Sequence, residues 1–482
     1  MEKLKNLLGI FVVIATITMM SCGDDEACDG KTCPSGQILD ANTCDCVIVN
    51  PEPCDGKTCP SGQILDASTC ECVDQSVCGG KTCPDGQVLD VSTCECVNTT
   101  SEVIIDRNII EDETWTPENI YILATRVTVV SGATLTIEPG TVIKGEAGSE
   151  ANATALLVAR GGKINADGTA EAPIIFTSVA DEIVSGQIES PNLPVDISGL
   201  WGGVIILGNA PISADADAVQ IEGIPPSDQN GLYGGTDPAD NSGVLRYVSI
   251  RHGGTDIGEG NEINGLTLGG VGTGTVIDHV EVVSNVDDGI EFFGGSVDAT
   301  NLLVWGQGDD AYDCDQAYTG TIDNFIYIAG SESDHGLELD GPEGSTTGSF
   351  TLKNGSLKGL KGEYTDLRSK VECNLENLYY FSFSSDSDFE FDNNGVSQNY
   401  LDGKINLSNL EFNTSHLTEG NLTIEDIILE KTGDEEMKLG IFGTRPLDAS
   451  IQVVTMPTVG ADKSEYSGWS LADVKGELAD FN

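Results

Sequence analysis

The chain has 482 residues, and its 78 Asp and Glu residues against 23 Lys and Arg residues give a formal net charge of −55. This charge argues against nucleic acid as a partner, because binding a phosphate backbone requires many Lys and Arg side chains. The hydrophobic fraction of 39% lies in patterned runs and argues against disorder of the whole chain, since it can form a large core.

Residues 1–21 have the features of a secretory signal peptide. Two lysines precede an apolar run at residues 7–20, which is shorter than the ~20 residues of a membrane span. The string MMSC at residues 19–22 resembles a bacterial lipobox, which implies cleavage before Cys22 and acylation of its thiol. The acidic string GDDE in segment 22–27 resembles the surface-export signal of Bacteroidota lipoproteins. We therefore expect an outer-membrane protein anchored in lipid through Cys22 and facing the cell exterior, with an ordinary signal peptide as the alternative.

Residues 28–98 contain three copies of one unit with the spacing C-x4-C-x10-C-x-C, starting at Cys28, Cys54 and Cys78. Units this small bury too little core to fold alone, so four cysteines in an exported unit predict two disulfides each. Zinc is the alternative, although C-x-C is not the usual C-x2-C zinc knuckle. The units resemble epidermal-growth-factor-type modules, and their pairing stays open among three connectivities. Their position between the expected lipid anchor and a larger domain predicts a stalk. The predicted disulfide cysteines are Cys28, Cys33, Cys44, Cys46, Cys54, Cys59, Cys70, Cys72, Cys78, Cys83, Cys94 and Cys96.

Residues 99–482 show short apolar alternations between Gly- and Asp-rich turns, which predict an all-β domain. Similar strings begin at residues 265, 289, 311 and 336, a spacing of about 24 residues that indicates a solenoid with two or three short strands per coil. Leucine-rich repeats have this period but also a helical return segment, which is missing here. The fold we predict is a right-handed parallel β-helix, with Gly468 and Trp469 in a C-terminal end cap.

Side-chain alternation sorts the repeated strand into an inward and an outward face. The predicted inward residues are Leu266, Leu268, Ile290, Phe292, Tyr312, Cys314, Leu337, Leu339, Phe389 and Phe391. One outward column is Thr267, Glu291, Asp313, Glu338, Arg368 and Glu390, and a second is Phe293, Asp315, Asp340, Lys370 and Asp392. A further column of Asn301, Asn324, Asn377 and Asn409 suits an internal ladder of stacked amides. Cys314 and Cys373 are expected to be buried free thiols, because about two coils separate them.

The carboxylates of the outward columns have three interpretations. They can cap tight turns and pair with Arg368 and Lys370. They can bind Ca2+, which takes six to eight oxygen ligands, and the residues available for this are Glu291, Asp313, Asp315, Glu338 and Asp340.

The third interpretation is catalysis. The strings NVD at 285–287, GDD at 308–310, HG at 335–336 and RSK at 368–370 resemble the signature of polygalacturonase-type glycoside hydrolases. The resemblance implies that Asp310 is the general acid, that Asp287 and Asp309 activate water with help from His335, and that Arg368 and Lys370 hold a substrate carboxylate. Such an inverting mechanism requires carboxyl groups roughly 6.5–9.5 Å apart.

The strings DDGIEFFGG at 287–295 and SDHGLELDG at 333–341 make the β-helix more similar to β-helical surface lipoproteins of the Bacteroidota, a resemblance that implies no activity. We therefore expect a non-catalytic protein that binds a glycan or an outer-membrane partner protein, with Ca2+ as a cofactor. The alternative is a hydrolase of acidic polysaccharide.

Overall fold

The computed structural model describes residues 101–148, 153–256, 262–418, 422–432 and 435–481, together with short stretches between residues 37 and 98. The chain divides into two compact units, Met1–Thr99 and Thr100–Asn482. Cys22, the signal peptide and the acidic segment that follows it lie outside the described residues.

In the first unit, each Cys-rich repeat contains one antiparallel hairpin. The hairpins are β1 (Gln37–Leu39) with β2 (Cys46–Ile48), β3 (Gln63–Leu65) with β4 (Cys72–Asp74), and β5 (Gln87–Asp90) with β6 (Glu95–Asn98). A disulfide joins Cys59 to Cys72, the second and fourth cysteines of their repeat, and Cys94 is also disulfide-bonded. The prediction of disulfides is therefore confirmed for these three cysteines, and the side chains of the other nine lie outside the described residues.

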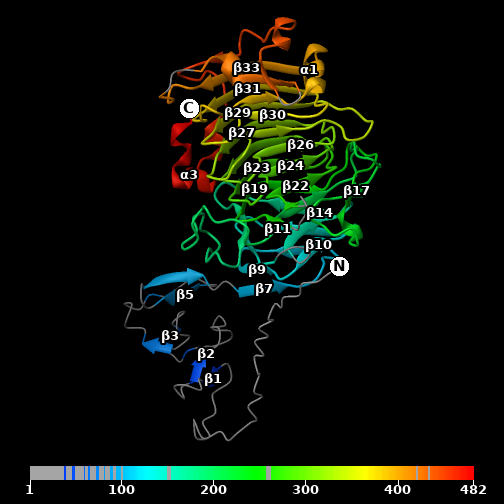
Figure 1. Ribbon diagram of the computed structural model, residues 1–482. Coiled ribbons are helices and arrows are strands. Elements are labelled where there is room, and N and C mark those ends of the chain that lie inside the picture. The colour runs from blue at the N-terminus through cyan, green and yellow to red at the C-terminus, as the bar shows by residue number, and fades with distance from the viewer. Residues whose placement is uncertain are drawn as a thin grey trace, which may run out of the picture. The chain divides into compact units, whose positions relative to one another are not determined.

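In the second unit, most of the described strands form two long sheets that run side by side along the solenoid (Figure 1). The 11-stranded sheet contains β10 (Arg126–Val129), β13 (Ala155–Val158), β16 (Val204–Leu207), β22 (Leu266–Gly269), β24 (Ile290–Phe293), β26 (Tyr312–Asp315), β28 (Leu337–Leu339), β30 (Thr365–Leu367), β32 (Phe389–Phe391), β34 (Ile428–Thr432) and β35 (Glu435–Lys438). The 15-stranded sheet contains β7 (Ser101–Ile105), β8 (Glu113–Trp115), β9 (Asn119–Leu123), β11 (Thr134–Ile137), β12 (Val142–Gly145), β14 (Lys163–Asp167), β15 (Ile174–Ser178), β19 (Gly243–Arg251), β23 (Val276–Val283), β25 (Ala299–Trp305), β27 (Thr321–Ile328), β29 (Phe350–Lys358), β31 (Cys373–Phe381), β33 (Ile405–Asn413) and β36 (Gln452–Val453).

Strands in these sheets pair in parallel with the strand of the next coil, and β34 with β35 is the one antiparallel pair among the described strands of the two sheets. Successive coils therefore stack in register, which is the right-handed parallel β-helix that the repeat period predicts. All ten predicted inward residues are buried, from Leu266 to Phe391, and Cys314 and Cys373 are buried free thiols as expected.

Long strands of the 15-stranded sheet bend at one residue with positive φ, which is Asn301 in β25, Asn324 in β27, Asn377 in β31 and Asn409 in β33. Asn tolerates this left-handed conformation better than other non-glycine residues. The side-chain amide of Asn324 donates to Asn301 Oδ1 over 2.7 Å, and that of Asn409 donates to Asn377 Oδ1 over 2.9 Å. A ladder of amides thus exists, but its members are half-buried or exposed on the bend and do not lie inside the solenoid.

The N-terminal half of the outer surface of the 11-stranded sheet lies under a long loop between β16 and β19. This loop contains two short strands, β17 (Val219–Gln220) and β18 (Leu232–Tyr233). Ile212, Ile224 and Tyr233 of the loop pack on outward residues of the sheet, including Phe293, which is only 7% exposed. The covered half is apolar, so the acidic columns begin where this loop ends.

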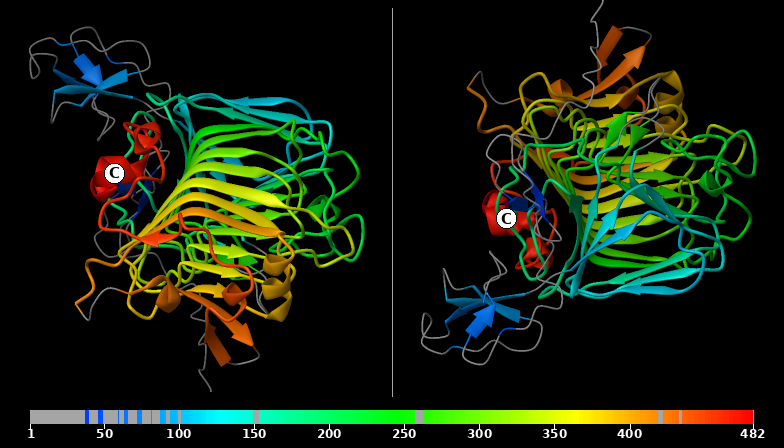
Figure 2. Two further views of the ribbon diagram at one scale, coloured as in Figure 1. Left: turned by 90° about the horizontal axis from the view of Figure 1, so that it is seen from above. Right: turned by 90° about the horizontal axis from the view of Figure 1, so that it is seen from below.

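The C-terminal segment folds back along the outer surface of the 15-stranded sheet. Tyr466, Trp469 and Phe481 pack on outward residues of β25, β27 and β31, and Glu281 of β23 accepts hydrogen bonds from the first backbone N–H groups of α3 (Leu471–Lys475). Figure 2 shows α3 beside the solenoid. The segment covers a side of the solenoid and not its open end, where we expected Trp469.

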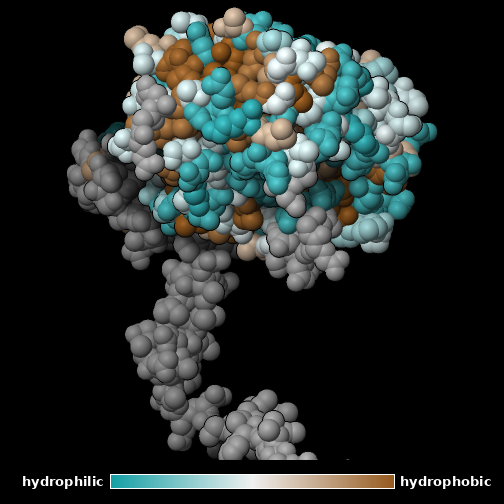
Figure 3. Space-filling model, turned by 45° about the horizontal axis from the view of Figure 1, so that its top comes forward, coloured by the Kyte–Doolittle hydropathy of each residue, from teal (hydrophilic) through white to brown (hydrophobic). Residues whose placement is uncertain are grey.

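At the end of the solenoid, α1 (Asn394–Leu401) and α2 (Ile424–Ile427) lie near the last coils. Tyr400 of α1 packs edge-on against Phe391 and Phe442. Hydrophobic residues gather on this end, which Figure 3 brings forward. In the described part of the chain, no helix has the length and apolar character of a membrane span.

Candidate functional site

The acidic face is the group of outward carboxylates on five successive strands of the 11-stranded sheet. The register pairs Glu291 with Asp313, Asp313 with Glu338, Glu338 with Asp366, and Asp366 with Glu390. These five residues, Glu291, Asp313, Glu338, Asp366 and Glu390, therefore form one continuous column across five coils.

The predicted place of Arg368 in this column is wrong by two residues, because the outward position of β30 is occupied by Asp366. The register follows from burial of Thr365 and Leu367 in the core, where the Thr365 hydroxyl hydrogen-bonds to Tyr380 Oη over 2.9 Å. Thr365 is thus a polar residue at an inward position, and a search for alternating apolar residues does not recognise it as inward. Arg368 comes after the strand and takes the place in the second column that was predicted for Lys370.

At the N-terminal end of the acidic face, Asp288, Glu291 and Asp313 have ligand oxygens within 4.8 Å of one another. Asp288 and Glu291 are 7% and 6% exposed, and Asp313 Oδ1 is enclosed without a hydrogen-bond partner. Among the described residues, none of the three forms an ion pair with Lys or Arg. Burial, and then the neighbouring carboxylates, raise the pKa of all three groups well above the usual range. Like charges in this arrangement require either protonation or a cation.

Asp287 and Asp309, which were predicted to activate water, lie together with Asp288 in a neighbouring cluster. Burial raises the pKa of Asp287 to about 8, with further contributions from the charges of Glu262 and Asp309. Burial and Asp310 raise the pKa of Asp309 to about 6. These two predicted site residues are therefore brought together by the fold.

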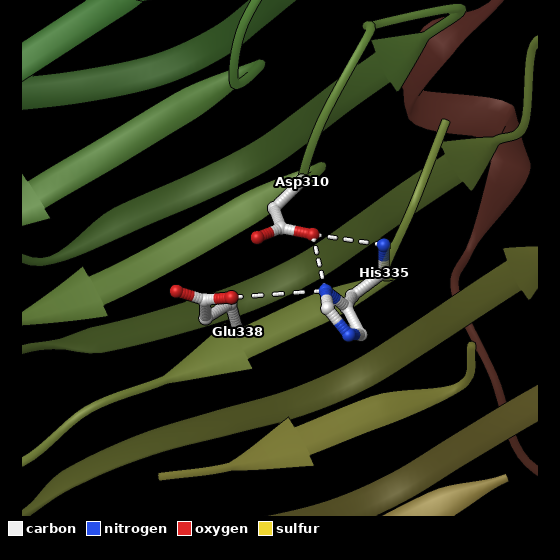
Figure 4. A group of neighbouring side chains, drawn as sticks. All are labelled: Asp310, His335 and Glu338. Carbon is white, nitrogen blue, oxygen red and sulfur yellow. Dashed lines mark hydrogen bonds and ion pairs between the residues drawn. The ribbon is translucent and has the colours of Figure 1, made fainter. Parts of the chain in front are cut away.

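Asp310 and His335 are joined directly (Figure 4). His335 Nδ1 lies 2.7 Å from Asp310 Oδ1, and the backbone N–H of His335 donates to the same oxygen over 2.8 Å. Glu338 Oε2 lies 3.7 Å from His335 Nδ1, and Glu363 Oε2 lies 3.6 Å from His335 Nε2. Burial would lower the pKa of His335, but hydrogen bonds with Asp310 and Glu363 raise it to about 11.

Arg368 and Lys370 do not act as a pair. Arg368 contacts Glu338 directly and lies 3.5 Å from Asp340 and 3.7 Å from Asp366, so it neutralises the middle of the acidic face. Lys370 Nζ instead donates to the carbonyl oxygen of Pro342 over 3.0 Å. At the C-terminal end of the face, Lys431 pairs with Glu390.

Two further residues of the predicted calcium set, Asp315 and Asp340, lie in the second column, whereas Glu338 lies in the first. Burial raises the pKa of Asp315 to about 6 and that of Asp340 to about 7, with nearby carboxylates contributing in both cases. The cationic partners of Glu338 and Asp340 distinguish them from Asp288, Glu291 and Asp313.

Sequence reasoning missed several residues of this site. Asp366 and Glu363 belong to a coil whose register was misassigned. Accepting Thr as well as apolar residues at the inward positions of the strand could have revealed the correct register. Glu222 comes from the covering loop, and burial together with Glu262, Asp315 and Glu343 raises its pKa to about 7. Because loops carry no repeat period, no sequence signal placed Glu222 beside the face.

The stacked parallel coils define a parallel β-helix that carries a column of outward carboxylates. The model of the pectate-lyase-like β-helix domain matches residues 107–444, so the chain belongs to this family. Neither a curated protein nor a solved structure matches the chain.

Proposed function

We propose that the protein binds carbohydrate, without catalysis, through a calcium ion held on the acidic face. The observation that carries the proposal is the group Asp288, Glu291 and Asp313, whose carboxylates are enclosed together with one unpartnered oxygen and, in the described part of the chain, have no ion pair with Lys or Arg. Ca2+ prefers carboxylate oxygens and takes six to eight ligands, so three carboxylates leave coordination positions for another molecule. Family membership supports a carbohydrate as that molecule.

The net charge determines which carbohydrate can bind. A face of carboxylates repels an anionic glycan, but a bound Ca2+ with open positions attracts sugar carboxylates and hydroxyls. We therefore infer that acidic glycans bind through the metal ion, and that the calcium set is Asp288, Glu291 and Asp313. Glu338 and Asp340 are less suited to this role because Arg368 already neutralises them.

Hydrolysis of acidic polysaccharide is the second candidate function, supported by the approach of Asp310 to His335. A general acid must reach the glycosidic oxygen within hydrogen-bond distance. Asp310 is 3% exposed, and its Oδ1 accepts two hydrogen bonds from His335. Because the Asp310 carboxylate is buried and already hydrogen-bonded, it is poorly placed to reach a glycosidic oxygen. This favours the binding function, for which we expect the wild type to release no reducing ends.

The location we propose is the outer membrane, with a lipid anchor at Cys22 and the Cys-rich repeats as a stalk that presents the β-helix to the exterior. The disulfide at Cys59–Cys72 supports an oxidising compartment. At this location the protein could also bind a neighbouring outer-membrane protein, which is the alternative to a carbohydrate partner.

The test of the proposed function is calorimetry with oligogalacturonides too short to form a calcium gel. Binding is expected in Ca2+ and not in chelator, and Asp313→Asn should abolish it. Asp402→Asn is the matched control, because Asp402 is exposed beyond α1. Binding that persists in chelator would contradict the calcium bridge. Release of reducing ends by the wild type, lost in Asp310→Asn, would establish the hydrolase instead.

A further inference from the structure

The group around His335 has a different chemistry from the calcium cluster, because it contains an imidazole. Asp310, His335 and Glu338 each offer one ligand atom, and these atoms lie within 4.8 Å of one another. Ca2+ prefers oxygen, whereas imidazole is a ligand of transition metals such as Zn2+. The mixed set of one nitrogen and two carboxylates therefore selects a different ion.

The distances suit one small ion between the three side chains. Ligand atoms bound to Zn2+ at about 2.0–2.2 Å lie about 3–3.5 Å from one another in tetrahedral geometry. His335 Nδ1 is 2.7 Å from Asp310 Oδ1 and 3.7 Å from Glu338 Oε2. Figure 4 shows that Nδ1 points between the two carboxylates while the other edge of the ring points away. These two separations lie within about 0.5 Å of the tetrahedral range, and the third, between the carboxylates of Asp310 and Glu338, is no longer than 4.8 Å.

The other ring nitrogen has the partner that a metal-binding histidine requires. Glu363 Oε2 lies 3.6 Å from His335 Nε2, on the side opposite to Nδ1. Metal-binding histidines usually donate their second N–H to a carboxylate, which fixes the ring orientation and the tautomer. With a metal ion bound at Nδ1, Glu363, His335 and the ion would form a carboxylate–histidine–metal triad. Glu363 would act as a positioning residue in it.

The backbone also holds this group in place. A parallel bridge joins His335 to Glu363 on the next coil, and the backbone N–H of His335 donates to Asp310 on the preceding coil. Arg368 contacts Glu338 through Oε1, which leaves Oε2 facing the imidazole. Side-chain exposures of 13% for His335 and 14% for Glu338 provide access from solvent.

We propose that Asp310, His335 and Glu338 form a binding site for a transition-metal ion of the Zn2+ type, separate from the calcium cluster. The site does not depend on the proposed carbohydrate function, because it uses none of the residues Asp288, Glu291 and Asp313.

The experiment is titration of the chelator-treated full chain with Zn2+ alone, followed by metal analysis of the dialysed protein. The wild type should retain one more equivalent of Zn2+ than His335→Gln. Zinc held by cysteines is the same in both proteins and cancels in the comparison. His416→Gln is the control and should bind like the wild type, because His416 Nε2 contacts the Phe383 carbonyl oxygen elsewhere.

Glu363→Gln tests the positioning role. Loss of a second-sphere carboxylate typically weakens metal affinity 10–100-fold, so we expect that loss for Zn2+ with unchanged Ca2+ affinity. The metal-free variant should still unfold in one cooperative transition, which separates positioning from loss of the fold.

Equal Zn2+ content in wild type and His335→Gln would overturn the proposal. If His335→Gln does not fold, pulsed electron paramagnetic resonance of the Cu2+-loaded wild type decides the matter. Coupling to one imidazole nitrogen is expected, and a spectrum without imidazole coupling would contradict the site.

Discussion

His335 Nδ1 lies 2.7 Å from Asp310 Oδ1, although 25 residues separate the two in sequence. The contact exists because each coil of the β-helix places its turn directly above the turn of the preceding coil. The same stacking brings carboxylates together along the whole acidic face. Their mutual repulsion is the physical basis of the predictions that follow.

We predict that the metal-free protein is more stable at about pH 5 than at about pH 8. The pKa values of Asp287 and Asp388 are raised to about 8, and those of Asp340 and Asp366 to about 7, chiefly by burial. Because the native state binds more protons than the unfolded state above about pH 4, stability falls as the pH rises toward 8. His335, with its pKa raised to about 11, contributes in the same direction above about pH 6.5.

Thermal melts in chelator measure this dependence. The melting temperature should fall between pH 5 and pH 8 in chelator, and Ca2+ should reduce the fall by replacing the bound protons. A melting temperature that rises across this range in chelator would show that the buried carboxylates have ordinary pKa values.

The sequence predicted the fold and most of the acidic face, because both depend on strict alternation along strands such as β24 and β28. Prediction failed at β30, where inward Thr365 hides the alternation and shifts the register by two residues. It also failed for Trp469, whose position depends on long-range ring contacts with Tyr247 and His279 that carry no local signal. For the same reason, Glu222 in the covering loop could not be placed.

Arg368→Met should destabilise the metal-free protein by about 1 kcal/mol, because Arg368 pairs with Glu338 and approaches Asp340 and Asp366 while remaining partly exposed. The same change should strengthen Ca2+ binding, since it removes a positive charge from the acidic face. Denaturant unfolding and calcium titration measure the two effects.

Arg107→Met is the matched control for this prediction. Arg107 pairs with Glu113 over 3.0 Å on an early coil and should leave calcium affinity unchanged. A weaker calcium affinity in Arg368→Met would mean that Arg368 organises the calcium ligands instead of competing with the ion.

Cys22→Ala should release the protein from the membrane, because the thiol that we expect to carry the lipid is removed. Fractionation of cells into soluble and membrane fractions measures the change. Protease added to intact cells should digest the wild type, and neutral replacements of Asp24, Asp25 and Glu26 should reduce that digestion. Complete protection of the wild type from external protease would rule out the surface location.

Calcium titration calorimetry on wild type, Asp313→Asn and Asp402→Asn tests the central claim most directly. Ca2+ at ~100 times its dissociation constant adds about 2.7 kcal/mol to the stability of a protein with one site, so melts can be compared on the same samples. The account predicts a calcium isotherm and thermal stabilisation for wild type and Asp402→Asn, and neither for Asp313→Asn. Identical isotherms for all three proteins, or no heat from the wild type at millimolar Ca2+, would contradict it.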